Sequence, residues 1–410
     1  MHQDRALEIM MRGDNIILTG PAGAGKSYLI DKFVKKARRH GKKVSITATT
    51  GIAASNIGGS TIHSWSGIGI GNKLHPDFVY TISDGRKKAI NKIDVLIIDE
   101  VSMMNSYVID MVNDAMKIIR ESEEPFGGLQ VILVGDFFQL PPVDKTGNGG
   151  FITESAAWKE LNLTVCYLEE QHRTDDNRLQ EILNRMREGT LRQKHMNWLM
   201  ERWRITPPED TTRLYTLNVD VDKENEKRLA EVPGDTQYYL RTYRGSNYEA
   251  IENLQRSVLA PQLLALKVGA LVMAVKNDPA GDYANGSIGT VESFTDEGLP
   301  CVILQSGKRV VFTPQEWEAR KNDKLLAAIT QIPLRLAYAI TVHKSQGMTL
   351  DAAEVDLSSA FAPGMGYVAL SRVRTLGTLY IKGLNQRSLM VSDKAREIDK
   401  ELREKSRSML

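Results

Sequence analysis

The sequence has little of what disulfide-stabilised, zinc-binding or membrane proteins need. Its 410 residues include only two cysteines, Cys166 and Cys301, which lie far apart. They form neither a disulfide framework nor a structural metal site, which favours a reducing compartment. No apolar run approaches the roughly 18 residues of a membrane span, and the N-terminus lacks the apolar core of a signal peptide. We therefore expect a cytoplasmic protein that does not act at a membrane.

An excess of charge of one sign is also absent. The formal net charge is only +2, so any binding of nucleic acid must come from a local groove and not from a globally basic surface. Hydrophobic residues make up 42% and charged residues 25%, as in ordinary soluble globular proteins. The length predicts two or more domains, each able to bury its own core.

One stretch matches a specific nucleotide-binding pattern. Residues 20–27, GPAGAGKS, satisfy G-x-x-x-x-G-K-[ST], between an apolar segment at 16–18 and a segment with helical apolar spacing that Gly41 is placed to end. Lys26 can then reach the β- and γ-phosphates and Ser27 can bind Mg²⁺. A chance match in a glycine-rich turn is the alternative, but both flanks are those the motif requires. The predicted ATP-binding residues here are Pro21, Ala22, Gly23, Ala24, Gly25, Lys26 and Ser27.

Acidic and amide side chains follow two further apolar segments. Asp99 and Glu100 end the run at 95–98, where a buried parallel strand would present its carboxyl end. We expect Asp99 to hold the Mg²⁺ water shell and Glu100 to polarise the attacking water. Gln139 follows the run at 130–134 and could hydrogen-bond the γ-phosphate or that water. Alternatively, the prolines beside Gln139 mark only a stiff, capped turn.

Six other positions are candidates for the nucleotide site. Gln3 could recognise adenine, although from its position alone a surface glutamine is the simpler interpretation. Arg173 could face the nucleotide from a second lobe beginning near residue 164, or could pair at the surface with Glu169 or Glu170. Arg372 is a candidate arginine finger. Ser345, Gln346 and Gly347 could offer donors to a nucleotide or to a phosphate backbone.

Several residues are candidates for contacts with DNA. Thr49 follows the predicted strand at 44–47, where small residues could let a phosphodiester approach, although an ordinary strand-to-helix turn fits equally well. Residues 58–86 break the alternating pattern and contain six glycines with Thr61, His63 and Trp65. Such rings could stack on unpaired bases or could form a hydrophobic plug under a long loop.

Taken together, these motifs resemble the PIF-type (petite integration frequency) DNA helicases, of the RecD-like branch of superfamily one. The resemblance covers nearly the whole chain and depends on the strings GPAGAGKS, TATTGIAA, GGSTIHSWSGIG, LIIDEVSMM, VGDFFQLPPV, HKSQGMTLD and YVALSRVRT. It implies an α/β fold with two RecA-like parallel-sheet lobes that bind ATP between them. The implied domains are lobe 1A at 1–58 and 87–163, insertion 1B at 59–86 beside the strand-separation point, lobe 2A at 164–276 and 336–410, and a small β-barrel, 2B, at 277–335.

The resemblance also implies roles for residues. Gln3 matches the adenine-recognising glutamine, which reverses the preference from position alone. Lys26, Ser27, Asp99, Glu100 and Gln139 match the phosphate, metal, base and sensor positions, and Arg173 and Arg372 the two arginines of the second lobe. The motifs that touch DNA contain Thr49, Thr61, His63, His343, Lys344 and Ser345.

The resulting hypothesis is an ATP- and Mg²⁺-dependent 5′→3′ DNA helicase. We expect a monomer in solution that binds single-stranded DNA and forked or structured DNA, in repair, recombination or replication. A P-loop kinase is one alternative, and its ATP turnover would not be accelerated by DNA. A protein that uses ATP as a switch to load onto DNA without unwinding it is another. The charged tail at 392–410 is expected to form an exposed helix.

Overall fold

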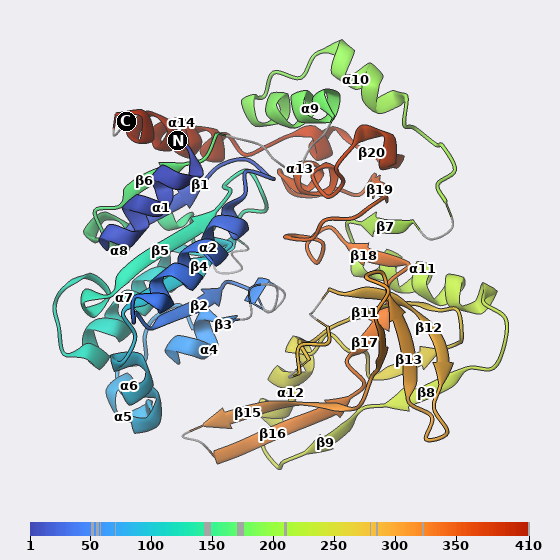
Figure 1. The fold of residues 1–410 in the computed structure, drawn as a ribbon, viewed down its shortest axis with the longest axis horizontal. Coiled ribbons are helices and arrows are strands. Elements are labelled where there is room, and N and C mark those ends of the chain that lie inside the picture. Colours follow the sequence, from blue (N-terminus) through green and yellow to red (C-terminus); the bar gives the residue numbers. More distant parts are fainter. Residues whose placement is uncertain are drawn as a thin grey trace. The chain divides into compact units, whose positions relative to one another are not determined.

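The computed structural model describes residues 1–50, 53–54, 57, 59–69, 71–142, 149–169, 176–208, 211–278, 280–283, 286–321 and 324–408. The chain forms two compact units (Figure 1). Unit 1 comprises Met1–Thr206 and Ser345–Leu410, and unit 2 comprises Pro207–Lys344. These units differ from the predicted domains, whose boundaries stay a prediction.

A six-stranded parallel sheet forms the centre of unit 1, in the order β3-β2-β4-β5-β1-β6. Its central strands are continuous apolar runs buried on both faces, the pattern of a parallel sheet covered by helices. This confirms the expected parallel-sheet α/β core. The strands are β1 (Ile16–Thr19), β2 (Val44–Ala48), β3 (Ser60–Thr61), β4 (Val95–Asp99), β5 (Gln130–Gly135) and β6 (Thr164–Tyr167).

Helices α1 and α2 share one hydrophobic core with this sheet, in which Met10 and Phe33 pack with Ile16 and Leu18. A parallel pair, β19 (Ala353–Leu357) and β20 (Leu379–Leu384), also belongs to unit 1. The helices of unit 1 are α1 (Gln3–Arg12), α2 (Lys26–Arg39), α4 (Ile62–Ser66), α5 (Phe78–Thr81), α6 (Asp84–Asn91), α7 (Ser106–Arg120), α8 (Ala156–Glu160), α9 (Asn177–Glu188), α10 (Gln193–Met200), α13 (Met365–Leu370) and α14 (Asp393–Arg407). Short 3₁₀ turns are η1 (Val101–Met103), η2 (Pro125–Gly128), η3 (Ile152–Glu154), η4 (Leu376–Thr378) and η5 (Gln386–Leu389).

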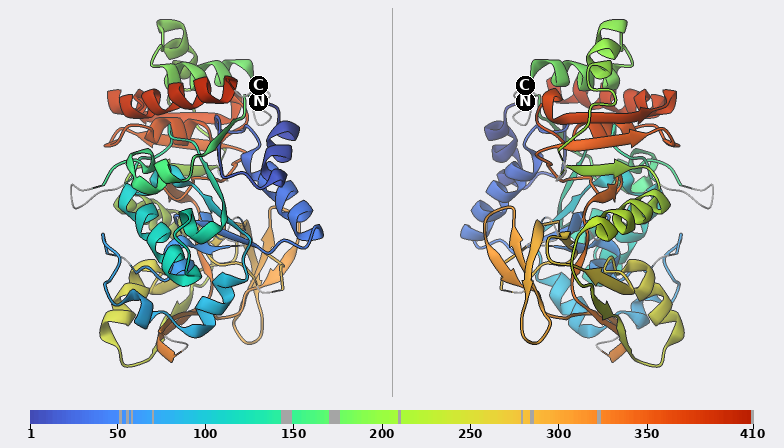
Figure 2. Two further views of the ribbon diagram at one scale, coloured as in Figure 1. Left: turned by 90° about the vertical axis from the view of Figure 1, so that its left-hand side faces the viewer. Right: turned by 90° about the vertical axis from the view of Figure 1, so that its right-hand side faces the viewer.

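Two segments of unit 1 differ from expectation. Strand β6, where we expected the second lobe to begin, pairs in parallel with β1 and is an edge strand of the first sheet. The charged tail forms α14, but the helix is not simply exposed. Small and apolar residues recur on one face and are buried, and Ser406 Oγ accepts a hydrogen bond from the N–H of Tyr167 at 3.3 Å. Figure 2 shows the start of the chain beside the end of α14 in both views.

Unit 2 is mainly antiparallel. It contains a five-stranded sheet in the order β14-β13-β12-β11-β17, a three-stranded sheet β15-β16-β9, the pair β10-β8, and the parallel pair β18-β7. The described strands leave open edges at β14 and β17, so closure into the expected barrel stays a prediction. The elements are β7 (Thr212–Tyr215), α11 (Asn218–Glu231), β8 (Gln237–Leu240), β9 (Thr242–Arg244), α12 (Tyr248–Ser257), β10 (Leu263–Leu266), β11 (Leu271–Ala274), β12 (Ile288–Phe294), β13 (Pro300–Leu304), β14 (Arg309–Val311), β15 (Gln315–Lys321), β16 (Lys324–Gln331), β17 (Leu334–Leu336) and β18 (Ala339–Thr341).

Within the described ranges, none of the helices is long and apolar enough to cross a membrane.

Candidate nucleotide and DNA sites

The predicted phosphate loop joins β1 to α2 in unit 1. Gly25 lies immediately before α2 with φ 81°, a left-handed conformation that favours glycine. The Lys26 side chain folds back onto the loop, since its Nζ donates to the carbonyl oxygens of Gly20 at 2.8 Å and Pro21 at 3.0 Å. Burial lowers the pKa of Lys26. A phosphate would give this buried cation an anionic partner.

A pocket of about 390 Å³ opens beside this loop. Residues predicted from distant parts of the sequence line it together, including Glu100, Gln139, Gly347 and Arg372. Its full lining is Ala22, Gly23, Ala24, Gly25, Lys26, Ser27, Tyr28, Glu100, Gln139, Gly347, Thr349, Arg372 and Arg374. A close backbone approach helps to build it, because a Cβ on Gly364, just before α13, would lie 2.6 Å from the carbonyl oxygen of Gln139.

The two acids at the end of β4 are held tightly. Glu100 has φ 55°, an uncommon conformation for a residue other than glycine, and its N–H donates to Asp99 Oδ1 at 2.8 Å. Gln346 Nε2 donates to Glu100 Oε2 at 2.9 Å and so orients the predicted base. Burial and the neighbouring Glu100 charge raise the pKa of Asp99 to about 7, and burial raises the pKa of Glu100. A divalent cation would relieve both effects, so the carboxylate and the Ser27 hydroxyl fit Mg²⁺.

Two glutamines have amide oxygens that are buried without a partner among the described residues. These atoms are Oε1 of Gln139, which lines the pocket, and Oε1 of Gln346, which is bonded through its nitrogen to Glu100. Buried polar atoms normally find partners. Both amide oxygens can therefore accept a hydrogen bond from a donor outside the protein.

The structure places two of the three other predicted nucleotide-site residues, Arg372 and Gln3, and does not describe Arg173. Arg372 lines the pocket but is only 1% exposed, and its guanidinium donates to the carbonyl oxygens of Val368, Ser345 and Met348. Contact with a phosphate would exchange some of these bonds. Gln3 Nε2 donates to the carbonyl oxygen of Ala24 at 3.3 Å, which places Gln3 against the phosphate loop. Arg173 lies outside the described residues.

The predicted DNA contacts fall in both units. Thr49 is bonded directly to the acidic pair: its Oγ1 donates to the carbonyl oxygen of Glu100 at 3.0 Å and its N–H to that of Asp99 at 3.3 Å. Thr61 caps α4, accepting from the N–H of Ser64. His63 and Trp65 are half-buried on this helix, and burial lowers the pKa of His63.

The second group of predicted DNA contacts lies at 343–345. His343 and Lys344, in unit 2, are half-buried. Ser345, in unit 1, is fully buried, so its side chain is not on the surface of this structure. The motif around residue 345 therefore contributes backbone and neighbouring side chains to the surface and keeps its serine inside.

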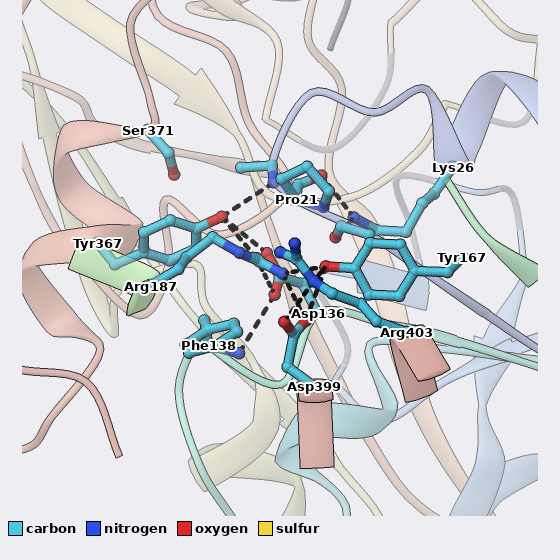
Figure 3. Close-up of polar contacts among 12 residues, drawn as sticks. Pro21, Lys26, Asp136, Phe138, Tyr167, Arg187, Tyr367, Ser371, Asp399 and Arg403 are labelled. Carbon is cyan, nitrogen blue, oxygen red and sulfur yellow. Dashed lines mark hydrogen bonds and ion pairs between the residues drawn. The ribbon is translucent and has the colours of Figure 1, made fainter. Parts of the chain in front are cut away.

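A buried polar network that was not predicted from the sequence lies beside the phosphate loop (Figure 3). The hydroxyl of Tyr367 accepts from the N–H of Ala22 at 3.0 Å and donates to Asp136 Oδ2 at 3.0 Å. Arg187 Nη1 donates to Asp136 Oδ1 at 2.7 Å and to the Tyr367 hydroxyl at 3.0 Å. The network thus ties the phosphate loop to the segment that precedes Gln139.

The other half of the network reaches the C-terminal helix. Arg187 Nη2 donates to Asp399 Oδ1 at 2.8 Å and to the Tyr167 hydroxyl at 2.9 Å, and Arg403 Nε donates to Asp399 Oδ2 at 2.8 Å. Burial raises the pKa of Tyr167 to about 12, so its hydroxyl keeps its proton. One signal was available: Arg187 occupies the apolar face of α9, with Leu183 and Met186, where a charge requires buried partners.

Comparison with known proteins gives the family of this chain. A family model described as PIF1-like helicase matches residues 4–199. A Psychrobacter protein named ATP-dependent DNA helicase Pif1 is 38% identical over 470 residues, covering 99% of this chain and 71% of the relative. This chain belongs to the PIF1-like helicase family. Membership confirms the predicted family and enzyme class, an ATP-hydrolysing DNA helicase.

Solved structures of PIF1-like helicases extend the likeness to the fold. The Pif1 helicase of Candida albicans matches with a TM-score of 0.90 and 33% identity, covering 98% of both chains. A Bacteroides Pif1 helicase in complex with ADP-AlF3 and single-stranded DNA matches with a TM-score of 0.78 and 31% identity, covering 99% of this chain and 98% of that one.

Proposed function

We propose that this protein is a motor that hydrolyses ATP, moves 5′→3′ on single-stranded DNA and separates duplex or forked DNA ahead of it. The observation that supports the ATPase best is the pocket beside the phosphate loop, because the loop, Glu100, Gln139 and Arg372 converge on it from four separate segments. The related Bacteroides protein was solved with ADP-AlF3 and single-stranded DNA, which supports both ligands. The direction follows from family resemblance.

In this proposal the phosphate loop holds the triphosphate. Its backbone N–H groups and Lys26 bind the β- and γ-phosphates, and Gln3 contacts adenine. Mg²⁺ bound by Ser27 and Asp99 supplies charge neutralisation at the phosphates. Gln346 and Gly347 complete the nucleotide-facing wall.

Hydrolysis then depends on two polar side chains and two arginines. Glu100, oriented by Gln346, accepts a proton from the attacking water, and Gln139 holds that water in line. Arg372 and Arg173 stabilise the charge that develops on the γ-phosphoryl group. After hydrolysis these arginines lose their shared partner, and the segments that bear them are released.

The link from hydrolysis to DNA starts at Thr49. Thr49 is hydrogen-bonded to the backbone of Glu100 and Asp99. A shift of these two acids would therefore move Thr49, a proposed DNA contact. Thr61, His63 and Trp65 would hold the strand in unit 1, together with His343, Lys344 and the segment at Ser345. We further propose that 59–86 stands beside the strand-separation point, that 277–335 closes a small barrel, and that the protein acts as a cytoplasmic monomer.

A forked-duplex assay tests the proposal. We expect release of the labelled strand from a fork with a 5′ tail, a requirement for hydrolysable ATP, and little release from a fork with a 3′ tail. Turnover accelerated by single-stranded DNA but without strand release would support the ATP switch instead. Turnover indifferent to DNA would support a kinase-like phosphate-transfer enzyme.

A further inference from the structure

Unit 2 contains a second pocket, of about 540 Å³, that the nucleotide site does not use. It lies among residues of α11, the segment after α12, β10 and β17. One part of its lining is cationic, with Arg241, Arg335 and Lys344. Another part is apolar and includes Leu259, Pro261 and Leu263.

Arg335 is the unusual member of this pocket. It lies in β17, paired opposite Met273 of β11, and is only 9% exposed. Among the residues that the structure describes, the Arg335 side chain makes no hydrogen bond and no ion pair, and its Nε is buried without a partner. Burying an unpaired guanidinium is costly, and the group does not lose its proton to escape that cost. An anionic partner from outside the protein would offset the cost.

Two neighbouring cations, Arg241 and Lys344, add to the positive charge that an anionic partner would offset. Arg241 is held in place by bonds from Nη2 to the carbonyl oxygens of Val258 and Ala260, while its Nε is buried without a partner in the described chain. Burial, and next the Arg335 charge, lower the pKa of Lys344 to about 8, and the nearby charge of Asp222 acts in the opposite direction. An anion between these groups would hold all three in their charged forms.

Two carboxylates, Asp222 and Glu226, also line the pocket, and both are exposed. The Asp222 charge partly opposes the lowering of the Arg335 pKa by burial, but neither carboxylate forms an ion pair with Arg335 among the described residues. The pocket therefore offers a buried guanidinium, two further cations and an apolar wall. A phosphate group matches the guanidinium fork, and the sugar or base attached to it matches the apolar wall.

We propose that this pocket binds one backbone phosphate of the single-stranded DNA, with Arg335 as the residue that holds it and Arg241 and Lys344 as supporting cations. The inference rests on the proposed function only in taking single-stranded DNA as the ligand. Leu259, Pro261 and Leu263 then lie against the adjoining nucleotide. Arg335 is a DNA-binding residue that lies outside the ATPase machinery.

The test compares Arg335→Met with a matched control, Lys223→Met. Lys223 is an exposed cation on α11 that does not line the pocket. Affinity for a fluorescent oligo-deoxythymidine strand is measured by anisotropy over a salt series, without nucleotide. We expect Arg335→Met to weaken binding about tenfold and to reduce the slope of log K against log[salt] by about 0.7, the value for one lost phosphate contact on a single strand. Lys223→Met should leave both unchanged, and Arg335→Lys should keep the slope.

Thermal unfolding separates this role from a structural one. Removing an unpaired buried charge should leave the melting temperature of Arg335→Met unchanged or higher. An unchanged salt slope in the folded variant overturns the proposal.

Competition by inorganic phosphate, at matched ionic strength, should weaken DNA binding in the unmodified protein. If Arg335→Met abolishes phosphate binding but binds DNA normally, the pocket takes free phosphate and the DNA assignment is wrong. Failure of the unmodified protein to release strands would refute the motor, while the salt slope would still decide the pocket.

Discussion

Four arginines are buried in the described structure, Arg187, Arg241, Arg335 and Arg372, and their partners differ in kind. Arg187 in unit 1 makes four hydrogen bonds through its Nη groups, two of them to the carboxylates of Asp136 and Asp399, and its guanidinium lies 4.2 Å from the ring centroid of Phe138. The Arg335 side chain in unit 2 has neither a hydrogen bond nor an ion pair among the described residues. Nε is buried without a described partner in both arginines, so the contrast lies in the Nη groups: those of Arg187 are bonded to carboxylates and hydroxyls, and those of Arg335 are not.

Arg372 is intermediate in its hydrogen-bond partners. It is satisfied by backbone carbonyl oxygens and the hydroxyl of Ser371, which are neutral acceptors, and it lines the nucleotide pocket. Charged hydrogen bonds to a phosphate are stronger than those to carbonyls. The comparison therefore predicts three classes of mutational effect, on turnover, on stability and on DNA affinity.

The largest expected effect is on turnover. Arg372→Ala should reduce the ATPase rate by about 10³ to 10⁵ because the transition-state charge loses a cation. ATP binding, measured by a fluorescent analogue, should persist. Arg39→Ala, which removes an exposed arginine at the end of α2, is the control and should turn over normally. An unchanged rate in Arg372→Ala would remove this residue from the site.

The next effect is on stability. Arg187→Met should lower the free energy of unfolding by about 3–5 kcal/mol, because Asp136 and Asp399 lose a buried counter-charge. Urea unfolding measures the change. The control is Arg185→Met, on the exposed side of the same helix, where the pair with Glu188 is worth less than about 1 kcal/mol. If Arg187→Met were as stable as the unmodified protein, the contrast with Arg335 would disappear.

A smaller loss is expected for Tyr367→Phe. It removes one hydroxyl and leaves the N–H of Ala22 and one oxygen of Asp136 without that partner, a cost of about 1–3 kcal/mol in unfolding free energy. The KM for ATP should also rise because the phosphate loop loses an anchor. Tyr80→Phe, at a tyrosine that is 84% exposed, serves as control. A normal KM together with lowered stability would limit the hydroxyl to a structural role.

The smallest effect on the salt dependence of DNA binding is expected for Trp65→Ala. If Trp65 stacks on a base, single-strand affinity should fall by about 1–3 kcal/mol. The salt slope should stay the same because no phosphate contact is lost, in contrast to Arg335→Met. Anisotropy over the same salt series measures both quantities. Unchanged affinity and unchanged strand release would assign Trp65 to packing.

That several predicted residues line one pocket beside the phosphate loop could be expected from the sequence, because they lie in short local motifs. The strand, loop and helix around Lys26, the acids after β4 and the turn at Gln139 each follow from a few consecutive residues. Parallel strands then bring their carboxyl ends to one edge of the sheet. Local residues also limit α9, which begins after the N-cap Asp176 and ends before Gly189, with φ 67°.

The network around Arg187 was not predictable in the same way. Its partners come from segments near residues 136, 167, 367 and 399, and no local pattern joins them. The buried face of α14 was missed because its small and polar residues, such as Ser406, do not stand out as apolar. Arg335 gave a weak signal, as a single charge between Leu334 and Leu336 in an apolar strand.

The most direct measurement of the central claim is strand release by Lys26→Ala on a fork with a 5′ tail, beside the unmodified protein and the exposed control Lys36→Ala. We predict that Lys26→Ala binds the single strand but neither turns over ATP nor releases the strand, while Lys36→Ala does both. Normal strand release by Lys26→Ala would contradict an engine driven from this pocket.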